Sequence, residues 1–194
     1  MLPISLLDSP GALAWDSLPL VKLTCFPFAH GHTLPFSQAR LAALEGRELR
    51  IRMWSFEVGA PMDSRLGMLL CRGGHALSFV LSPGSPCEAM IKEKGGWAPG
   101  PALPLLSLAG EDLQGEFWGA EVSLPLSLLS RVFPGFTLAS AQALEGCLWK
   151  GMGHRLEEFG CSYWDSLSLF PETIPSQKLP GDLISLERLE LVSY

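Results

Sequence analysis

Alternation of apolar and polar side chains is the clearest pattern along this chain. In segment 48–56, Leu, Ile and Met alternate with two arginines and a tryptophan, and segment 117–124 alternates in a similar way. Side chains two residues apart lie on the same face of a β-strand, so both segments are predicted as half-buried strands. The inward faces of the alternating strands predict these core residues: Leu49, Ile51, Met53, Val122, Leu124, Leu186 and Leu191.

Shorter apolar segments bounded by turn residues predict further strands. These segments are 21–26, 66–71, 76–81, 87–92, 105–108 and 183–192. Arg72-Gly73-Gly74 between two of them indicates a hairpin turn. The alternation of the last segment is interrupted near Arg188, which indicates a β-bulge. The prolines and glycine at 99–101, with Pro104, predict a loop.

Pro125 marks the start of a short helix. It follows a predicted strand directly, and proline fits a first helical turn because that turn needs no backbone donor. Leu126, Leu128, Leu129 and Val132 fall where a helix would face the core. Many short strands with one short helix predict an all-β fold, namely a two-sheet antiparallel β-sandwich of the jelly-roll type.

Length and composition favour a single domain over residues 1–194. A chain of 194 residues suffices for one full core, and its 47% apolar content is too high for a disordered protein. The net charge of −6, without a run of Lys or Arg, argues against nucleic acid as a partner.

No signal for a membrane or for export is found in the sequence. No apolar run approaches the ~18 residues that a membrane span needs. The first 14 residues lack a basic start and are interrupted by Asp8-Ser9-Pro10, so a leading strand or arm is expected there. The five cysteines contain no C-x-x-C pair, which indicates buried free thiols and a cytoplasmic location.

Three motifs in the C-terminal half resemble a known family. Trp118-x-x-Glu121 precedes Pro125, Trp149-Lys150 lies in a predicted strand, and Tyr163-Trp164-Asp165 follows in a polar loop. This order resembles that of the family 9 carbohydrate-binding modules and their DOMON-like bacterial relatives. Asp63-Ser64 matches an earlier family motif, Trp-x-x-Asp-Ser-x-x-Glu. Its first tryptophan is absent here, and Gly67 stands at its glutamate position.

The resemblance implies a saccharide site without a cofactor. Aromatic rings stack on the apolar face of a sugar ring, and polar side chains bind its hydroxyl groups. A mono- or oligosaccharide is therefore the expected partner, and the sequence gives no signal for the oligomeric state. The candidate ligand-binding residues are Trp164, Asp165, Tyr163, Trp149, Lys150, Trp97 and Asp63.

Each candidate tryptophan also has a structural interpretation. Trp164 could seal the edge of the sandwich, and Trp149, in the middle of a strand, could belong to the core. Trp97 lies in a segment rich in glycine and proline, where it would either fix a loop or be displayed for stacking. Lys150 is expected on the face opposite to Trp149, toward solvent or a cleft.

Neither a metal site nor a catalytic group is predicted. His30 and His32 lack carboxylate or cysteine neighbours, and no calcium-loop motif is present. No G-x-S-x-G elbow and no phosphate-binding loop occurs. The leading hypothesis is a non-catalytic saccharide-binding module. The alternatives are a structural or protein-interaction sandwich that has lost the sugar site and, third, a carbohydrate-active hydrolase with an acidic pair.

Overall fold

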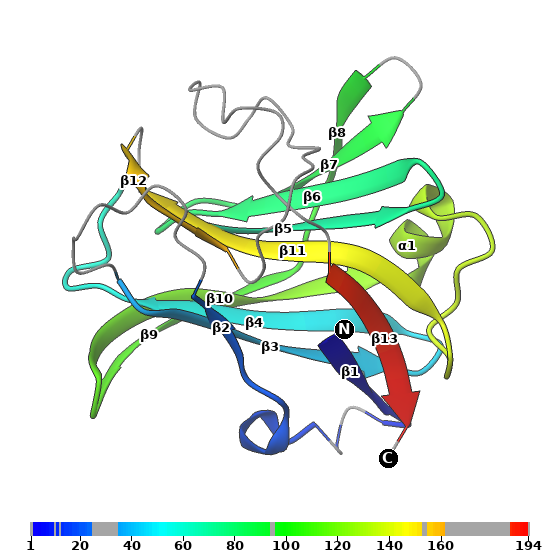
Figure 1. The fold of residues 1–194 in the computed structure, drawn as a ribbon, viewed down its shortest axis with the longest axis horizontal. Coiled ribbons are helices and arrows are strands. Elements are labelled where there is room, and N and C mark those ends of the chain that lie inside the picture. Colours follow the sequence, from blue (N-terminus) through cyan, green and yellow to red (C-terminus); the bar gives the residue numbers. More distant parts are fainter. Residues whose placement is uncertain are drawn as a thin grey trace.

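The computed structural model describes residues 2–9, 11, 13–24, 35–93, 96–152, 155–161 and 187–193. These residues form a β-sandwich whose two layers lie one above the other in Figure 1. The predicted all-β sandwich with a short helix is confirmed.

The first layer is antiparallel. In order it contains β8 (Gly96–Ala102), β7 (Glu88–Glu93), β6 (His75–Leu81), β5 (Ser64–Arg72) and β11 (Ala143–Met152). Strand β12 (Arg155–Cys161) pairs with the other edge of β11. The hairpin predicted at Arg72-Gly73-Gly74 is confirmed, because β5 and β6 pair directly across it.

The second layer lies below the first in Figure 1. In order it contains β1 (Leu2–Leu7), β3 (Ser37–Leu44), β4 (Glu48–Phe56), β10 (Gly115–Pro125) and β9 (Leu105–Asp112). The short strand β2 (Val21–Leu23) pairs with the first part of β3, and a 3-10 turn, η2 (Trp15–Ser17), precedes it.

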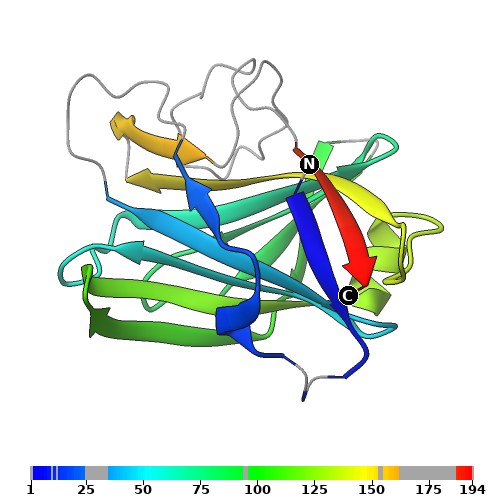
Figure 2. The same cartoon turned by 60° about the horizontal axis from the view of Figure 1, so that its bottom comes forward.

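Strands β1 and β13 (Glu187–Ser193) join the two layers along one side of the molecule. Strand β13 is antiparallel to β11 of the first layer and parallel to β1, which is itself parallel to β3. Figure 2 shows β1 and β13 side by side across this flank. The antiparallel prediction therefore holds for the two layers, but it fails at β1. Strand β13 pairs with β11 without a register shift at Arg188, so the β-bulge predicted there is wrong for this pairing.

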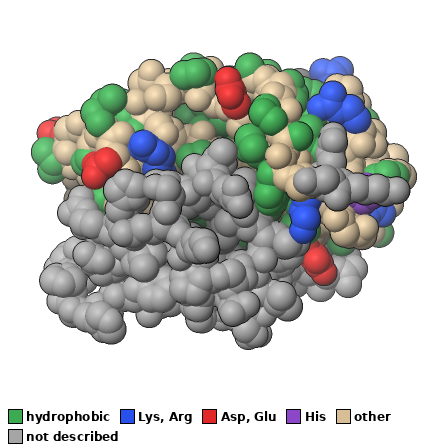
Figure 3. All heavy atoms as spheres, turned by 90° about the horizontal axis from the view of Figure 1, so that it is seen from above, with side chains coloured by type: hydrophobic (Ala, Val, Ile, Leu, Met, Phe, Trp, Pro, Cys, Tyr) green, Lys and Arg blue, Asp and Glu red, His purple; other side chains and the backbone are tan. Residues whose placement is uncertain are grey.

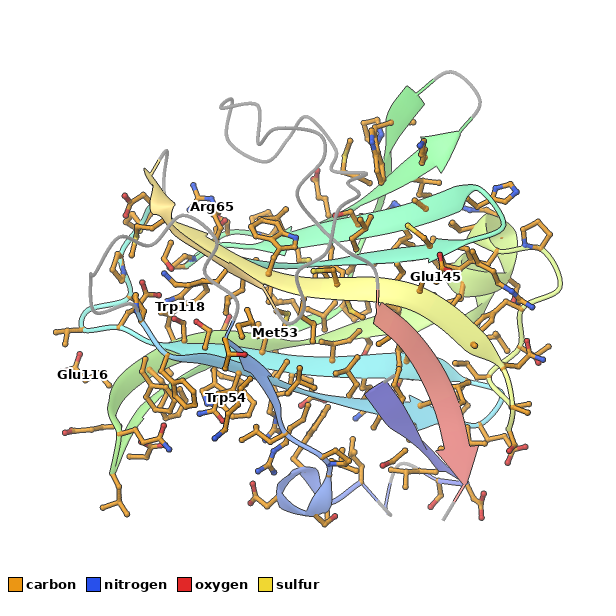
Figure 4. The ribbon with its side chains drawn as sticks, viewed as in Figure 1. Met53, Trp54, Arg65, Glu116, Trp118 and Glu145 are labelled. Carbon is orange, nitrogen blue, oxygen red and sulfur yellow. The ribbon has the colours of Figure 1, made fainter. Side chains whose placement is uncertain are left out.

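The core lies between the layers, and the alternation predicted its residues well. Leu49, Ile51, Met53, Val122, Leu124 and Leu191 are buried in one cluster. Leu186 lies outside the described residues. Figure 4 shows Met53 pointing into the space between the layers, whereas its neighbour Trp54 points away from it.

The helix α1 (Leu126–Val132) begins directly after Pro125, as predicted. Pro125 is both the last residue of β10 and the N-cap of the helix, with an extended backbone. Leu128, Leu129 and Val132 are buried, and the partly buried Leu126 packs against the same core. The helix therefore lies against one end of the sandwich.

The loop predicted around Pro99, Gly100 and Pro101 is wrong. These residues belong to strand β8, which pairs with β7 on one side only and with a register shift. An edge strand tolerates proline because half of its backbone groups face no partner strand. Trp97 is consequently a strand residue rather than a loop residue.

The buried thiols are confirmed for Cys71, Cys87 and Cys147, which are free and buried. Burial raises the pKa of Cys71 and of Cys87 to about 12 in each case. A thiol with so high a pKa stays protonated and unreactive at neutral pH.

Candidate functional site

A buried ion pair connects the two layers at one end of the sandwich. Lys150 lies on β11 and faces inward with its cross-strand neighbour Leu66, a core residue. Its Nζ is 2.9 Å from Oε1 of Glu57, and the two side chains are 0% and 4% exposed. Such a pair is costly to desolvate, so each charge depends on the other.

Glu57 has two further partners. Ser64 Oγ and Trp118 Nε1 both donate hydrogen bonds of 2.7 Å to its Oε2. Figure 4 shows Trp118 between the layers, on the inward face of β10. The carboxylate therefore gathers donors from β5, β10 and β11 around the residue that directly follows β4.

The partners of Glu57 decide its protonation state. Burial by itself raises the pKa of the carboxyl group, but the Lys150 ammonium and the hydrogen bonds from Ser64 and Trp118 outweigh it. The net result is a pKa below the ordinary value. Glu57 is therefore ionised at neutral pH, as a partner for a buried lysine must be.

This cluster clamps the turn that crosses from one layer to the other. We call residues 57–64 the clamped turn, because Glu57 at its start accepts a hydrogen bond from Ser64 at its end. Outside the clamp, the chain presents exposed side chains at Val58, Met62 and Asp63. Ala60 has a φ of 44°, a left-handed backbone that a non-glycine residue adopts only when its surroundings impose it.

Trp149 lies on the face of β11 opposite to Lys150, as the alternation predicted for this pair. Its side chain is 0% exposed. The indole covers Gly67 of β5 so closely that an added Cβ there would be 2.3 Å from Trp149 Cζ2. Gly67 is thus required for the position of Trp149. The indole fills the space beside the strand position where the resembled motif carries glutamate.

Trp97 lies on the outer face of the same layer. It is half-buried and packs against Leu69, Cys71 and Ala76. Gly67, Leu69 and Cys71 alternate along β5, so Trp97 and Trp149 cover the same face of this layer.

In Figure 3, which views the molecule from above, the described charged side chains are scattered among apolar ones.

The structure thus separates the predicted site residues that it describes. Lys150 lies inside the sandwich, Trp149 and Trp97 lie on the outer face of the first layer, and Asp63 is exposed on the clamped turn. Tyr163, Trp164 and Asp165 lie outside the described residues.

The sequence places the ligand site where the loop of Tyr163, Trp164 and Asp165 meets Lys150 and the turn 60–64, which ends at Ser64. Glu57 and Trp118 are not among its predicted site residues, and Trp118 is marked only as a motif position. For Glu57 the available signal was an acid placed directly after an alternating strand. Glu121, another motif position, lies on the outer face of β10 and pairs with Arg50 and Arg52.

Within the described ranges, no group of three or more His, Cys, Asp or Glu side chains could hold a metal ion. His30 and His32 lie outside those ranges. In the part of the chain that the structure describes, no helix has the length and apolar character that crossing a membrane requires.

Comparison with solved structures identifies the fold. A Bacteroides uniformis protein proposed to bind carbohydrate superposes with a TM-score of 0.65 at 13% identity, covering 98% of both chains. A family 9 carbohydrate-binding module from Caldicellulosiruptor kristjanssonii, solved in complex with glucose, gives a TM-score of 0.53 at 6% identity. That match covers 100% of this chain and 96% of the other.

The protein therefore has the fold of the family 9 carbohydrate-binding modules, which confirms the resemblance at the level of the fold. No family model and no curated protein matches the sequence.

Proposed function

We propose that this protein is a non-catalytic carbohydrate-binding module that holds a saccharide by aromatic stacking and hydrogen bonds. The shared fold supports this proposal, because the similarity extends over the whole chain and one neighbour was solved with glucose. Fold alone does not define function, so the proposal also rests on a site.

The clamped turn is the observation that carries the proposal. Side chains from β5, β10 and β11 fix Glu57 at the start of the turn, and none of these side chains has to contact the ligand. A rigid turn that displays Asp63 offers a carboxylate for sugar hydroxyl groups at little entropic cost. Trp164, Tyr163 and Asp165 are proposed to complete the site by stacking and hydrogen bonding.

The buried candidates take a different part in this proposal. Lys150 acts as a positioning residue, because it keeps Glu57 ionised and thereby holds the turn. Trp149 packs over Gly67 on the outer face of the first layer, and Trp97 lies on the same face.

Calorimetric titration with glucose and cellobiose tests this function. We expect Trp164→Ala and Asp63→Asn each to weaken binding several-fold or more, since a stacked ring contributes on the order of 1 kcal/mol beyond its buried area. Asp8→Asn is the matched control, because Asp8 is an exposed acid after β1. A wild-type protein that binds neither sugar would refute the proposal.

The main alternative is a structural or protein-interaction sandwich that has lost the sugar site. The fit of Trp149 against Gly67 favours it, because an indole occupies the space beside the glutamate position of the motif. In this alternative, the Trp164 side chain is buried against the edge of the sandwich. Trp164→Ala would then lower the free energy of unfolding by the ~3–5 kcal/mol typical of a buried tryptophan, and the melting temperature with it. No sugar would bind.

A hydrolase is the weaker alternative. A glycosidase needs a general acid whose pKa is raised, and Glu57, whose pKa is lowered, does not fit that role. No motif in the sequence places a nucleophile or an acid/base pair. We therefore expect no turnover of 4-nitrophenyl glycosides. Turnover that survives purification and disappears on substitution of one acidic residue would contradict the non-catalytic proposal.

A further inference from the structure

A pocket of about 380 Å³ lies on the outer face of the second layer, on the side of the sandwich away from the Trp149 face. It contains aromatic rings, amides and charged groups together. Its lining includes Trp15, Gln38, Arg40, Arg52, Trp54 and Gln114.

Strand register explains the shape of the pocket. Gln38, Trp54, Gly119 and Leu108 are neighbours in one row across β3, β4, β10 and β9. Gly119 places no side chain between Trp54 and Leu108, and a Cβ there would be 2.1 Å from the Met53 carbonyl oxygen. The row therefore has a gap beside the Trp54 indole, which Figure 4 shows pointing away from the core.

The next row adds aromatic rings. Phe56 and Phe117 face each other across β4 and β10, with ring centroids 5.9 Å apart in an edge-on arrangement. Both line the pocket beside Trp54. These rings are half-buried on the outer face of a sheet, where polar side chains are the usual occupants. A ligand that stacks on them would bury this apolar surface.

The turn η2 forms the opposite wall. Arg40 donates hydrogen bonds to the carbonyl oxygen of Trp15 and, at 2.9 Å, to the carboxylate of Asp16. The guanidinium of Arg52 lies 4.5 Å from the centre of the Trp15 ring, a cation–π contact. The Trp15 indole is thus held over the sheet from two strands.

The pocket lining carries two arginines and two aspartates, so its charge is balanced; Asp112 accepts a hydrogen bond from the backbone N–H of Gln114, and both arginines have carboxylate partners. Arg40 pairs with Asp16, and Arg52 pairs with Glu121 at 3.0 Å. The groups left for a ligand are the amides of Gln38 and Gln114, whose nearest atoms are 3.4 Å apart in a long hydrogen bond. Gln38 is buried. A ligand with a net charge would disturb these pairs, whereas hydroxyl groups suit the amides.

We propose that this outer-face pocket is a binding site for a neutral saccharide, separate from the site at the clamped turn. Aromatic walls, two amides joined only by one long hydrogen bond, and balanced charge are chemistry that suits a sugar ring. A volume of about 380 Å³ is at the lower end of the roughly 300–1,000 Å³ typical of ligand pockets, so one or two sugar rings fit. The pocket shares no residue with the clamped turn, and this inference does not depend on that site.

The test uses the full chain with Asp63→Asn and Trp164→Ala combined, which disables the clamped-turn site. In this background, titration with glucose and cellobiose measures the pocket alone. Adding Trp54→Ala or Gln114→Ala is expected to weaken the remaining binding about 2–10-fold, the value of one stacking or hydrogen-bonding contact. Gln142→Ala is the matched control, a half-buried glutamine beside β11 that should change nothing.

The outcomes separate the two proposals. Binding that persists in the background and falls with Gln114→Ala and Trp54→Ala supports the pocket. Binding by the wild type that vanishes in the background overturns the pocket and leaves the proposed function standing. Binding in the background that neither added substitution changes also overturns the pocket. A wild type that binds neither sugar overturns both, and preference for glucuronate or glucose 6-phosphate overturns the neutral-ligand assignment. Gln114 is exposed, so its variant stays informative if Trp54→Ala fails to fold.

Discussion

At the scale of single residues, the ion pair of Lys150 with Glu57 is the most consequential feature. Both groups are inside the sandwich, and the carboxylate also receives hydrogen bonds from Ser64 and Trp118. Removing one charge leaves the other buried without a counter-ion, which costs more than the pair itself contributes.

We therefore expect Glu57→Gln to lower the free energy of unfolding by about 3–5 kcal/mol. The double variant Glu57→Gln/Lys150→Met should regain a large part of this loss, because no unpaired charge remains. Urea denaturation of the three proteins measures the difference. If Glu57→Gln were as stable as the wild type, the ion pair would not hold the turn.

The same pair gives stability a pH dependence. Because the pKa of Glu57 is lowered in the folded state, the unfolded chain binds a proton more readily. The stabilisation from ionised Glu57 is fully present above the ordinary glutamate pKa of ~4.3. It is lost as the pH falls through the lowered pKa that Glu57 has in the folded protein. We expect the wild type to lose stability more steeply than the double variant below about pH 4. Parallel slopes for the two proteins would contradict this.

At the scale of elements, the strands at the two ends of the strand order, β8 and β9, differ. Strand β8 carries Pro99 and Pro101, which remove backbone donors, whereas β9 is exposed along nearly its whole length and contains no proline. Leu105 and Leu106 are among its exposed side chains. Edge strands open more easily than central ones because only one neighbour holds them.

Amide hydrogen exchange followed by mass spectrometry should rank the strands. Peptides from β8 and β9 are expected to exchange faster than those from β4 and β5, which have a partner strand on both sides. Protection of β9 equal to that of β4 would mean that another chain covers this edge in solution.

At the scale of the whole molecule, one core connects both layers. The main cluster contains residues from β5, β6 and β11 as well as from β3, β4 and β10, and β13 joins the layers by hydrogen bonds. A single core that cannot be divided should melt in one step.

We expect unfolding in urea to follow one transition, with the same midpoint by tryptophan fluorescence and by far-UV circular dichroism. Trp118 and Trp149 report on different layers, because one is inward on β10 and the other is on the outer face of β11. Two separated transitions would contradict the single domain predicted for residues 1–194.

The sequence by itself determined the strands whose one face is buried. In β4 and β10 the period of two is visible because inward apolar residues such as Leu49, Ile51 and Val122 are followed by outward polar ones. The helix after Pro125 was also determined, since proline restricts the backbone locally. These features depend on neighbours in the chain, so local patterns suffice to predict them.

Only the tertiary structure decided which residues meet. Glu57 and Lys150 are far apart in the sequence, and their pairing required β4 and β11 to lie in facing layers. Strand β8 formed despite its prolines because an edge position tolerates them. The outer-face pocket likewise depends on the register that sets Gly119 beside Trp54 and on η2 folding back over Arg52. Such contacts follow from the pairing of distant strands, which no local pattern encodes.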